Sequence, residues 1–359
     1  MKDKRLARVV RNMEELNLKQ ILVTQTESIY YLTGLWVQPG ERMLALKVDI
    51  DGCCTLYVNR MFALEGLCPG LRLKEFDDVD DPTGLLAAGL RTGRLGIDKF
   101  WPSRFTIELM QKRPDLEMVL GSEPVDRARM LKDQEELEAM RRSSRMNDQV
   151  VGALPQTLAL GDTEAQVGRR YAQQAVDLGA RGASFTPLVC FGKGCAEPHH
   201  SSDNTPLREG DAVILDLGLD LEHMMSDMTR TVFFGSVTPE QRKVYEVVKA
   251  ANEAGRAAVR PGIPMSQIDR AVRKVIEDAG YGPYFLHRTG HGIGLSVHEP
   301  PDCSAACHLI AQPGMVFSIE PGIYLAGKFG VRIEDLVAVT EDGGETLNAL
   351  DRELRVIEA

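Results

Sequence analysis

The 359-residue chain has no long apolar run and no basic stripe, and its cysteines are not even in number. No run approaches the roughly 20 apolar residues that cross a bilayer, and the charged residues 1–10 do not resemble a signal peptide. The net charge of −10 disfavours nucleic acid and anionic membranes as partners, because both are negatively charged. Seven cysteines, an odd number, fit a reducing compartment better than a disulfide framework. We therefore expect a cytoplasmic protein that binds neither nucleic acid nor membrane.

Histidine is also missing from the first 198 residues, and all seven histidines lie between His199 and His308. Three of them share residues 287–298, where glycines on both sides of His291 permit the close backbone approach that a tight ligand loop requires. His223 and His308 stand apart from this cluster and are better explained as ordinary histidines. The chemistry is therefore expected in the second half of the chain.

Four acids lie in or beside short apolar runs that are typical of buried strands: Asp216, Asp227, Glu320 and Glu334. The polar stretch 220–223 predicts a turn, so that a hairpin brings the first two carboxylates together, and a Gly-rich connection repeats the arrangement for the second pair. A carboxylate on a buried strand is costly unless a cation compensates it. Four carboxylates and the imidazole of His291 suit two divalent ions with a bridging hydroxide. The pattern predicts a two-metal hydrolase.

Helix-start signals and acid pairs both occur twice in the second half. Capping-box patterns at 133–136 and 163–166 precede the first acid pair, and those at 238–241 and 266–269 precede the second. Corresponding positions are 103 to 107 residues apart. A duplicated helix-helix-strand-strand unit with pseudo-twofold symmetry would place both acid pairs at the shared axis. This explains how ligands that are distant in sequence meet.

The first part of the chain alternates helical and strand-like patterns but is poor in candidate chemistry. With 43% hydrophobic and 26% charged residues, the chain is long enough for two domains. We predict an amino-terminal domain over residues 1–125, a linker over 126–132 and a catalytic domain over 133–359.

Five motifs, in order and with matching spacing, resemble the "pita-bread" metallopeptidases, family M24: residues 197–200, 216–231, 290–301, 319–324 and 331–335. Within that family the chain is similar to the Xaa-Pro peptidases, prolidase and aminopeptidase P. The resemblance covers nearly the whole chain. It implies an α+β fold, in which a smaller creatinase-like α/β domain precedes a duplicated pita-bread domain, and it implies a homodimer.

The resemblance assigns all five predicted ligands. It implies that Asp216 chelates one metal ion, that His291 and Glu320 hold the other, and that Asp227 and Glu334 bridge the two. The metals are divalent, and oxygen-rich ligation suits manganese, cobalt or zinc.

Four further residues match family positions. His199 and His298 match two histidines that bind no metal, hydrogen-bond the substrate and stabilise the tetrahedral intermediate. His287 matches a histidine near the proline pocket, and Arg332 would orient a ligand carboxylate.

The activity implied is hydrolysis of the amino-terminal Xaa-Pro bond of di- or oligopeptides. A methionine aminopeptidase would use the same ligands, but those relatives typically lack an added domain of this size. Non-catalytic peptide- or protein-binding relatives, and metal-free enzymes acting on small amidines, tend to lose ligands that this chain keeps.

The chain departs from the family pattern at two places. Residues 223–225 replace the Gly-Tyr that usually precedes the serine and aspartate of the second ligand, which implies different local packing. Asp302 stands where several dipeptide-cleaving relatives carry an arginine that pairs with the dipeptide carboxylate. An acid repels a carboxylate, so Asp302 disfavours strict dipeptidase activity.

Two other kinds of site fit the sequence less well. A serine nucleophile is disfavoured, because the serines near the histidines do not lie in a Gly-x-Ser-x-Gly elbow. Four thiols flank the motifs, but their spacing does not match common zinc sites and favours ordinary buried cysteines: Cys190, Cys195, Cys303 and Cys307.

Overall fold

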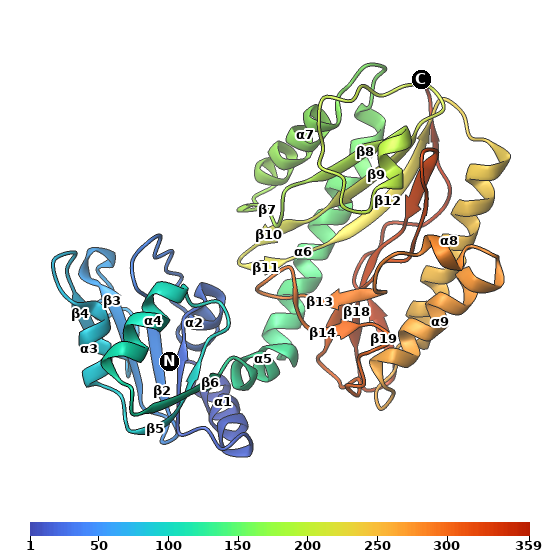
Figure 1. Ribbon diagram of the computed structural model, residues 1–359. Coiled ribbons are helices and arrows are strands. Elements are labelled where there is room, and N and C mark those ends of the chain that lie inside the picture. Colours follow the sequence, from blue (N-terminus) through green and yellow to red (C-terminus); the bar gives the residue numbers. More distant parts are fainter. The chain divides into compact units, whose positions relative to one another are not determined.

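Residues 1–129 form one of the two units into which the chain divides, in a computed structural model that describes residues 1–359 (Figure 1). Its six-stranded mixed sheet has the order β4-β3-β2-β1-β5-β6. The apolar side chains of β1 are buried, as expected for a central strand. The elements are α1 (Asp3–Glu15), β1 (Gln20–Val23), α2 (Thr26–Thr33), β2 (Ala45–Asp49), β3 (Cys54–Asn59), β4 (Arg72–Phe76), α3 (Pro82–Ala88), β5 (Gly93–Ile97), α4 (Ser103–Lys112), β6 (Leu116–Leu120) and α5 (Glu123–Met130).

Residues 130–359 form the second unit, so the boundary falls in the last turn of α5, inside the segment 126–132. The first half of this unit contains α6 (Gln134–Ala153), α7 (Glu164–Asp177), β7 (Gly182–Ala183), β8 (Leu188–Phe191), β9 (Ala212–Leu217), β10 (Leu219–Leu221), β11 (Met224–Met225) and β12 (Met228–Phe234). Its main sheet has the order β20-β12-β9-β8, in which β20 (Val356–Ile357) comes from the end of the chain.

The second half repeats two helices followed by strands. It contains α8 (Pro239–Ala258), α9 (Met265–Asp278), β13 (Gly290–Gly292), β14 (Glu299–Cys303), β15 (Val316–Ile319), β16 (Gly322–Leu325), β17 (Phe329–Arg332), β18 (Asp335–Val339), β19 (Gly344–Thr346) and β20 (Val356–Ile357). Its main sheet has the order β14-β13-β15-β18-β19. Figure 1 shows the strands of the second unit between the α6/α7 pair and the α8/α9 pair.

The predicted duplication is confirmed by the helix lengths. Helices α6 and α8 each have 20 residues, and α7 and α9 each have 14. Capping boxes begin α6, α7 and α8 at Asp133, Thr163 and Thr238, as predicted.

The fourth predicted capping box, at residues 266–269, is wrong. Helix α9 begins at Met265 after Pro264, and no side chain caps it. Asp269 is buried in the helix and bonds a distant segment instead. Tertiary partners therefore override a pattern that is a local signal.

Separate apolar clusters fill the two halves of the second unit. Side chains of α6 and α7 pack on β9 and β12, around Tyr171 and Phe234. Those of α8 and α9 pack on β15 and β18, around Val248 and Phe317. All seven cysteines are free thiols, and Cys190, Cys195 and Cys303 are buried. None of the helices combines the length and apolar character needed to span a bilayer.

Candidate metal centre

The predicted hairpin brings the first two acids together. Strands β9 and β12 pair antiparallel with Asp216 opposite Thr229, and Asp227 lies immediately before β12. The connection contains the pair β10/β11 and a turn at Glu222 and His223, which both have positive φ. Residues 223–225 therefore form the end of the turn and a short strand.

The Ser226 side chain is hydrogen-bonded within this connection. Its hydroxyl donates to the carbonyl of Leu219 (3.2 Å) and accepts from the Leu219 N–H (3.0 Å). The side chain is fully buried, so it holds the backbone beside Asp227 rather than serving as a nucleophile.

The second hairpin repeats the geometry. Ile319 pairs with Asp335 at the ends of β15 and β18, so that Glu320 and Glu334 lie just beyond the pairing. The Glu334 N–H donates to the Thr229 carbonyl (3.0 Å), which joins the second hairpin to the first. Predicted ligands that are more than 100 residues apart are therefore brought together by backbone hydrogen bonds between the two hairpins.

His291 is the central residue of β13, between Gly290 and Gly292. A Cβ atom on Gly290 would collide with the Ser318 carbonyl, and one on Gly292 with the Glu299 carbonyl. Glycine is required on both sides because neighbouring strands approach so closely. The His291 Nδ1–H donates to the Gly292 carbonyl (3.1 Å), which leaves Nε2 as a lone-pair donor.

One cavity of about 560 Å³ lies against these strands in the second unit. All nine residues singled out in the sequence line it: His199, Asp216, Asp227, His287, His291, His298, Glu320, Arg332 and Glu334. The His291 Nε2 atom lies 3.5 Å from Glu320 Oε1 and 3.7 Å from Asp227 Oδ2. Donor atoms of Asp227, His291 and Glu334 lie within 4.8 Å of one another.

Burial and mutual repulsion disturb the titration of the acids. The pKa of Asp227 is raised well above its usual value by burial and by Glu334, and that of Glu334 is raised by burial and by Glu320. Burial, together with Asp216, raises the pKa of Glu320 to about 7. Burial lowers the pKa of His291 to about 3, so its imidazole is neutral.

These residues fit divalent cations. Asp227 Oδ1 is buried and has no hydrogen-bond partner, which is costly for a carboxylate unless a cation binds it. The neutral His291 Nε2 and the neighbouring carboxylates are the donor types that divalent ions bind.

The raised pKa values predict an unusual pH dependence of stability. In the unfolded chain Glu320 has an ordinary pKa near 4.5, so the stability that protonated Glu320 contributes to the folded metal-free protein is lost as the pH rises through about 7. The lowered pKa values of His291, His287 and His298 act in the opposite direction, so the expectation concerns the effect of metal. The rise in melting temperature that metal ions produce should be larger at about pH 8 than at about pH 6, because protons compete with the ions for the carboxylates. Thermal melts with and without chelator test this, and parallel trends in the two samples would contradict it.

A hydrogen-bonded chain behind the cavity includes two residues that the sequence analysis missed, Thr229 and Tyr324. Arg332 donates to Asp216 Oδ2 (2.5 Å), to the Tyr324 hydroxyl (3.0 Å) and to Thr229 Oγ1 (3.2 Å). Thr229 donates to Glu334 Oε2 (2.7 Å). The Tyr324 hydroxyl lies 2.8 Å from His287 Nε2. These hydrogen bonds hold two carboxylates and a histidine in one arrangement, and Arg332 lies beside the carboxylate of Asp216, one of the predicted ligands.

Two buried asparagines, also missed, hold corresponding strand ends in the two halves. Asn147 of α6 donates to the Leu217 carbonyl (2.8 Å), and Asn252 of α8 donates to the Ile319 carbonyl (3.0 Å). Leu217 directly follows Asp216, and Ile319 directly precedes Glu320. Asn147 and Asn252 are 105 residues apart, which matches the separation between corresponding acids in the two halves. That match is a signal that the sequence contains.

Helix α9 anchors the histidine segment. Asp269 Oδ1 accepts from the Thr289 hydroxyl (2.7 Å), and Arg273 donates to the His287 carbonyl (2.6 Å). These contacts place residues 287–291 against the cavity.

The two histidines expected to contact substrate differ in their surroundings. The His298 ring is 4.1 Å from that of His291, edge to face, and burial lowers the pKa of His298. His199 is exposed, on the turn after the short helix 192–196. Its neighbour His200 bonds buried Glu164 (2.7 Å), whose carboxylate also accepts from the backbone N–H of Phe191 and Asp203. That carboxylate therefore fastens the loop that carries His199.

Fold and site together define a metal-dependent hydrolase, and comparisons with known proteins agree. Residues 138–341 match the metallopeptidase family M24, and residues 5–131 match the creatinase/prolidase N-terminal domain. The chain is 36% identical to the probable dipeptidase PepE of Mycobacterium tuberculosis, over 99% of this chain and 96% of that protein.

Solved structures agree over the full length. A prolidase from Thermococcus sibiricus matches with a TM-score of 0.95 and 34% identity, over 99% of both chains. A dipeptidase from Pyrococcus horikoshii matches with a TM-score of 0.93 and 34% identity, over 98% of this chain and 99% of that chain. The chain belongs to metallopeptidase family M24, with the pita-bread fold and a creatinase-type amino-terminal domain.

Proposed function

We propose that the protein is a dinuclear metal exopeptidase that hydrolyses the amino-terminal Xaa-Pro bond of di- or oligopeptides. The observation that carries the proposal is the convergence of four carboxylates and one neutral imidazole on one cavity, with a buried carboxylate oxygen lacking any partner. The similar proteins described above are named as dipeptidases and a prolidase, which agrees with peptide substrates.

The chain's own residues would hold two ions. Asp216 would bind one ion, His291 and Glu320 the other, and Asp227 and Glu334 both. Two divalent ions, when bound, supply Lewis-acid activation of water, which lowers its pKa from about 16 to about 7. Arg332 keeps the Asp216 carboxylate in place by a 2.5 Å bond.

The remaining cavity residues suit recognition of a peptide. Phe185, Leu188 and Val297 provide apolar surface of the kind that a proline ring needs. Burial lowers the pKa of His287 to about 4, so it lines this surface as a neutral imidazole. His298 and His199 would donate hydrogen bonds to the oxyanion that develops when the peptide carbonyl is attacked.

The proposal is tested on metal-stripped protein reloaded with manganese, cobalt or zinc, because ligand type alone does not select among these ions. Release of the first residue is followed from Ala-Pro, Ala-Pro-Ala and Met-Ala-Ser. Cleavage of either proline peptide with at least one metal is expected. Preference for Met-Ala-Ser would replace the proposal with a methionine aminopeptidase, and no turnover with any metal would favour a non-catalytic binding protein.

Replacement of His298 with alanine should separate catalysis from metal binding. We expect kcat to fall by about 100-fold or more, the cost of losing one oxyanion donor. Metal content should stay at the wild-type level, because His298 is not among the proposed ligands. Elemental analysis and steady-state kinetics check this, and equal losses in both would contradict the role of His298.

A further inference from the structure

Arg288 and Asp302 form an ion pair at the cavity. Neither residue is among the proposed metal ligands or the histidines that were given a role above. Arg288 lines the cavity three residues before His291, and its Nη1 donates to Asp302 Oδ1 at 2.5 Å. Asp302 lies on β14 directly opposite His291 on β13. Both side chains are solvent-accessible, at 38% for Arg288 and 55% for Asp302, so a substrate group can reach them.

Arg288 is one of two arginines that line the cavity, and the other is fully engaged. Arg332 is buried, and its Nε, Nη1 and Nη2 atoms all donate within the hydrogen-bonded chain behind the ligands. In Arg288, Nη1 alone has a partner, Asp302. The Nε–H and Nη2–H groups of Arg288 therefore remain as a fork that matches a carboxylate.

Arg288 lines the same cavity as the proposed metal ligands. A substrate positioned at those ligands therefore lies close to the charge of Arg288. The electrostatic attraction that a substrate experiences depends on whether Asp302 neutralises the charge of Arg288.

We propose that Asp302 sets the preference for substrate charge and length by pairing with Arg288, the cation that would otherwise hold the free carboxylate of a dipeptide. The inference rests on the proposed function, because it assumes that peptides bind at the ligands by their amino terminus. A dipeptide carries its carboxylate on the second residue, where a longer peptide carries a neutral amide. With Asp302 in place, attraction by Arg288 and repulsion by Asp302 largely cancel, so the site accepts longer peptides.

The test compares Ala-Pro with Ala-Pro amide, which differ in charge at this position, and with Ala-Pro-Ala. The quantity measured is the ratio of kcat/KM for Ala-Pro to that for Ala-Pro amide. We expect a ratio near one in the wild type. Asp302→Asn should raise it about fivefold, the factor that one partly exposed ion pair supplies. The gain should shrink as sodium chloride is added, because salt screens exposed charges.

A double-mutant cycle and a matched control identify the cause. Adding Arg288→Gln to Asp302→Asn should return the ratio to the wild-type value, because the cation is gone. Asp278→Asn removes an acid of similar exposure, paired with Lys274 on α9, and should leave the ratio unchanged. Thermal melts confirm that each variant folds. A ratio that does not change in Asp302→Asn, or a gain that survives Arg288→Gln, overturns the inference.

Failure of the proposed function gives a different result. If wild-type enzyme cleaves Ala-Ala and its amide but neither proline compound, proline specificity fails, and the charge ratio is measured on the Ala-Ala pair with the same expectation. If no compound is cleaved with any of the three metals, both the function and the inference are overturned.

Discussion

Replacing Asp227 with asparagine is expected to abolish stoichiometric metal binding and to lower kcat/KM by about a thousandfold or more. Asp227 is buried beside His291 and Glu334, and one of its oxygens has no hydrogen-bond partner. Asparagine keeps the shape but removes one of four negative charges that balance two dications. The loss corresponds to about 4 kcal/mol of transition-state stabilisation, within the several kcal/mol that metal catalysis supplies. Calorimetric metal titration and steady-state kinetics measure both effects.

A matched substitution on the same hairpin controls for local disturbance. Asp220 lies on β10, bonds the His223 N–H (2.8 Å) and does not line the cavity. Asp220→Asn retains that acceptor and should keep metal binding and activity near wild type. If Asp227→Asn also binds two ions with wild-type affinity, the assignment of Asp227 as a bridging ligand is wrong.

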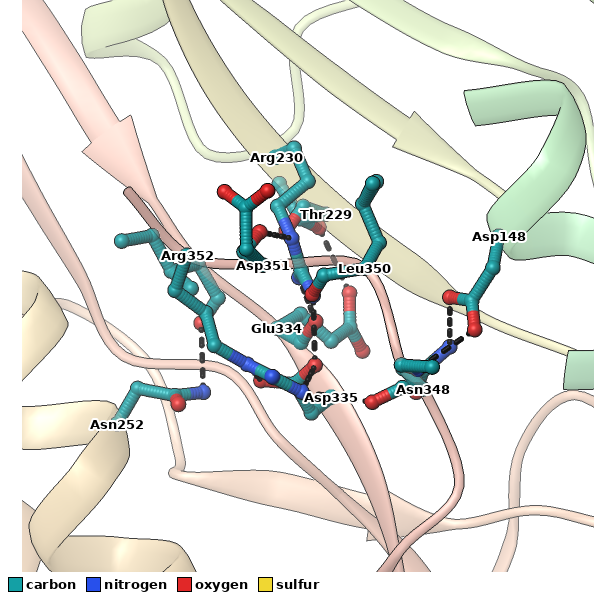
Figure 2. A network of polar contacts seen from close by, with 12 residues as sticks. Asp148, Thr229, Arg230, Asn252, Glu334, Asp335, Asn348, Leu350, Asp351 and Arg352 are labelled. Carbon is teal, nitrogen blue, oxygen red and sulfur yellow. Dashed lines mark hydrogen bonds and ion pairs between the residues drawn. The ribbon is translucent and has the colours of Figure 1, made fainter. Parts of the chain in front are cut away.

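Replacing Asp335 with alanine should lower the free energy of unfolding by about 3 to 5 kcal/mol, the usual cost of breaking a buried ion pair on one side. Asp335 is completely buried and bonds Arg230 (2.8 Å) and Arg352 (2.6 Å). Figure 2 shows both arginine side chains converging on this carboxylate. Against the cost of burial, the two arginines hold the pKa of Asp335 below its usual value. Without the carboxylate, the charges of buried Arg230 and partly buried Arg352 lose their common partner.

The same network supports the metal centre from behind. Arg230 also donates to the carbonyls of Glu334 (2.7 Å), Thr229 (2.9 Å) and Leu350 (2.7 Å) (Figure 2). Asp351→Ala is the control, because that half-exposed side chain pairs with Arg355 at the surface. We expect the control to lose at most about 1 kcal/mol. Denaturant unfolding of metal-free protein compares the two variants, and equal losses would show that the buried network adds nothing specific.

Local signals in the sequence were sufficient for much of the second unit. The capping boxes at Asp133, Thr163 and Thr238 were predicted because a cap depends on residues three positions apart. The two acid hairpins were predicted because apolar alternation and a polar turn are also local. The constant offset between the halves then indicated that the acids converge. The same reasoning failed at residues 266–269, where Asp269 bonds Thr289 rather than a helix terminus.

The sequence by itself determined which residue types can hold metal ions, in which order, and that they belong to two equivalent halves. The tertiary structure decided what surrounds them, namely Thr229 and Tyr324 behind the predicted ligands and Arg288 beside Asp302. The reason is physical. A strand or a cap is specified by neighbours along the chain, but a hydrogen bond between side chains far apart in sequence depends on strand register and helix docking, which no short pattern encodes.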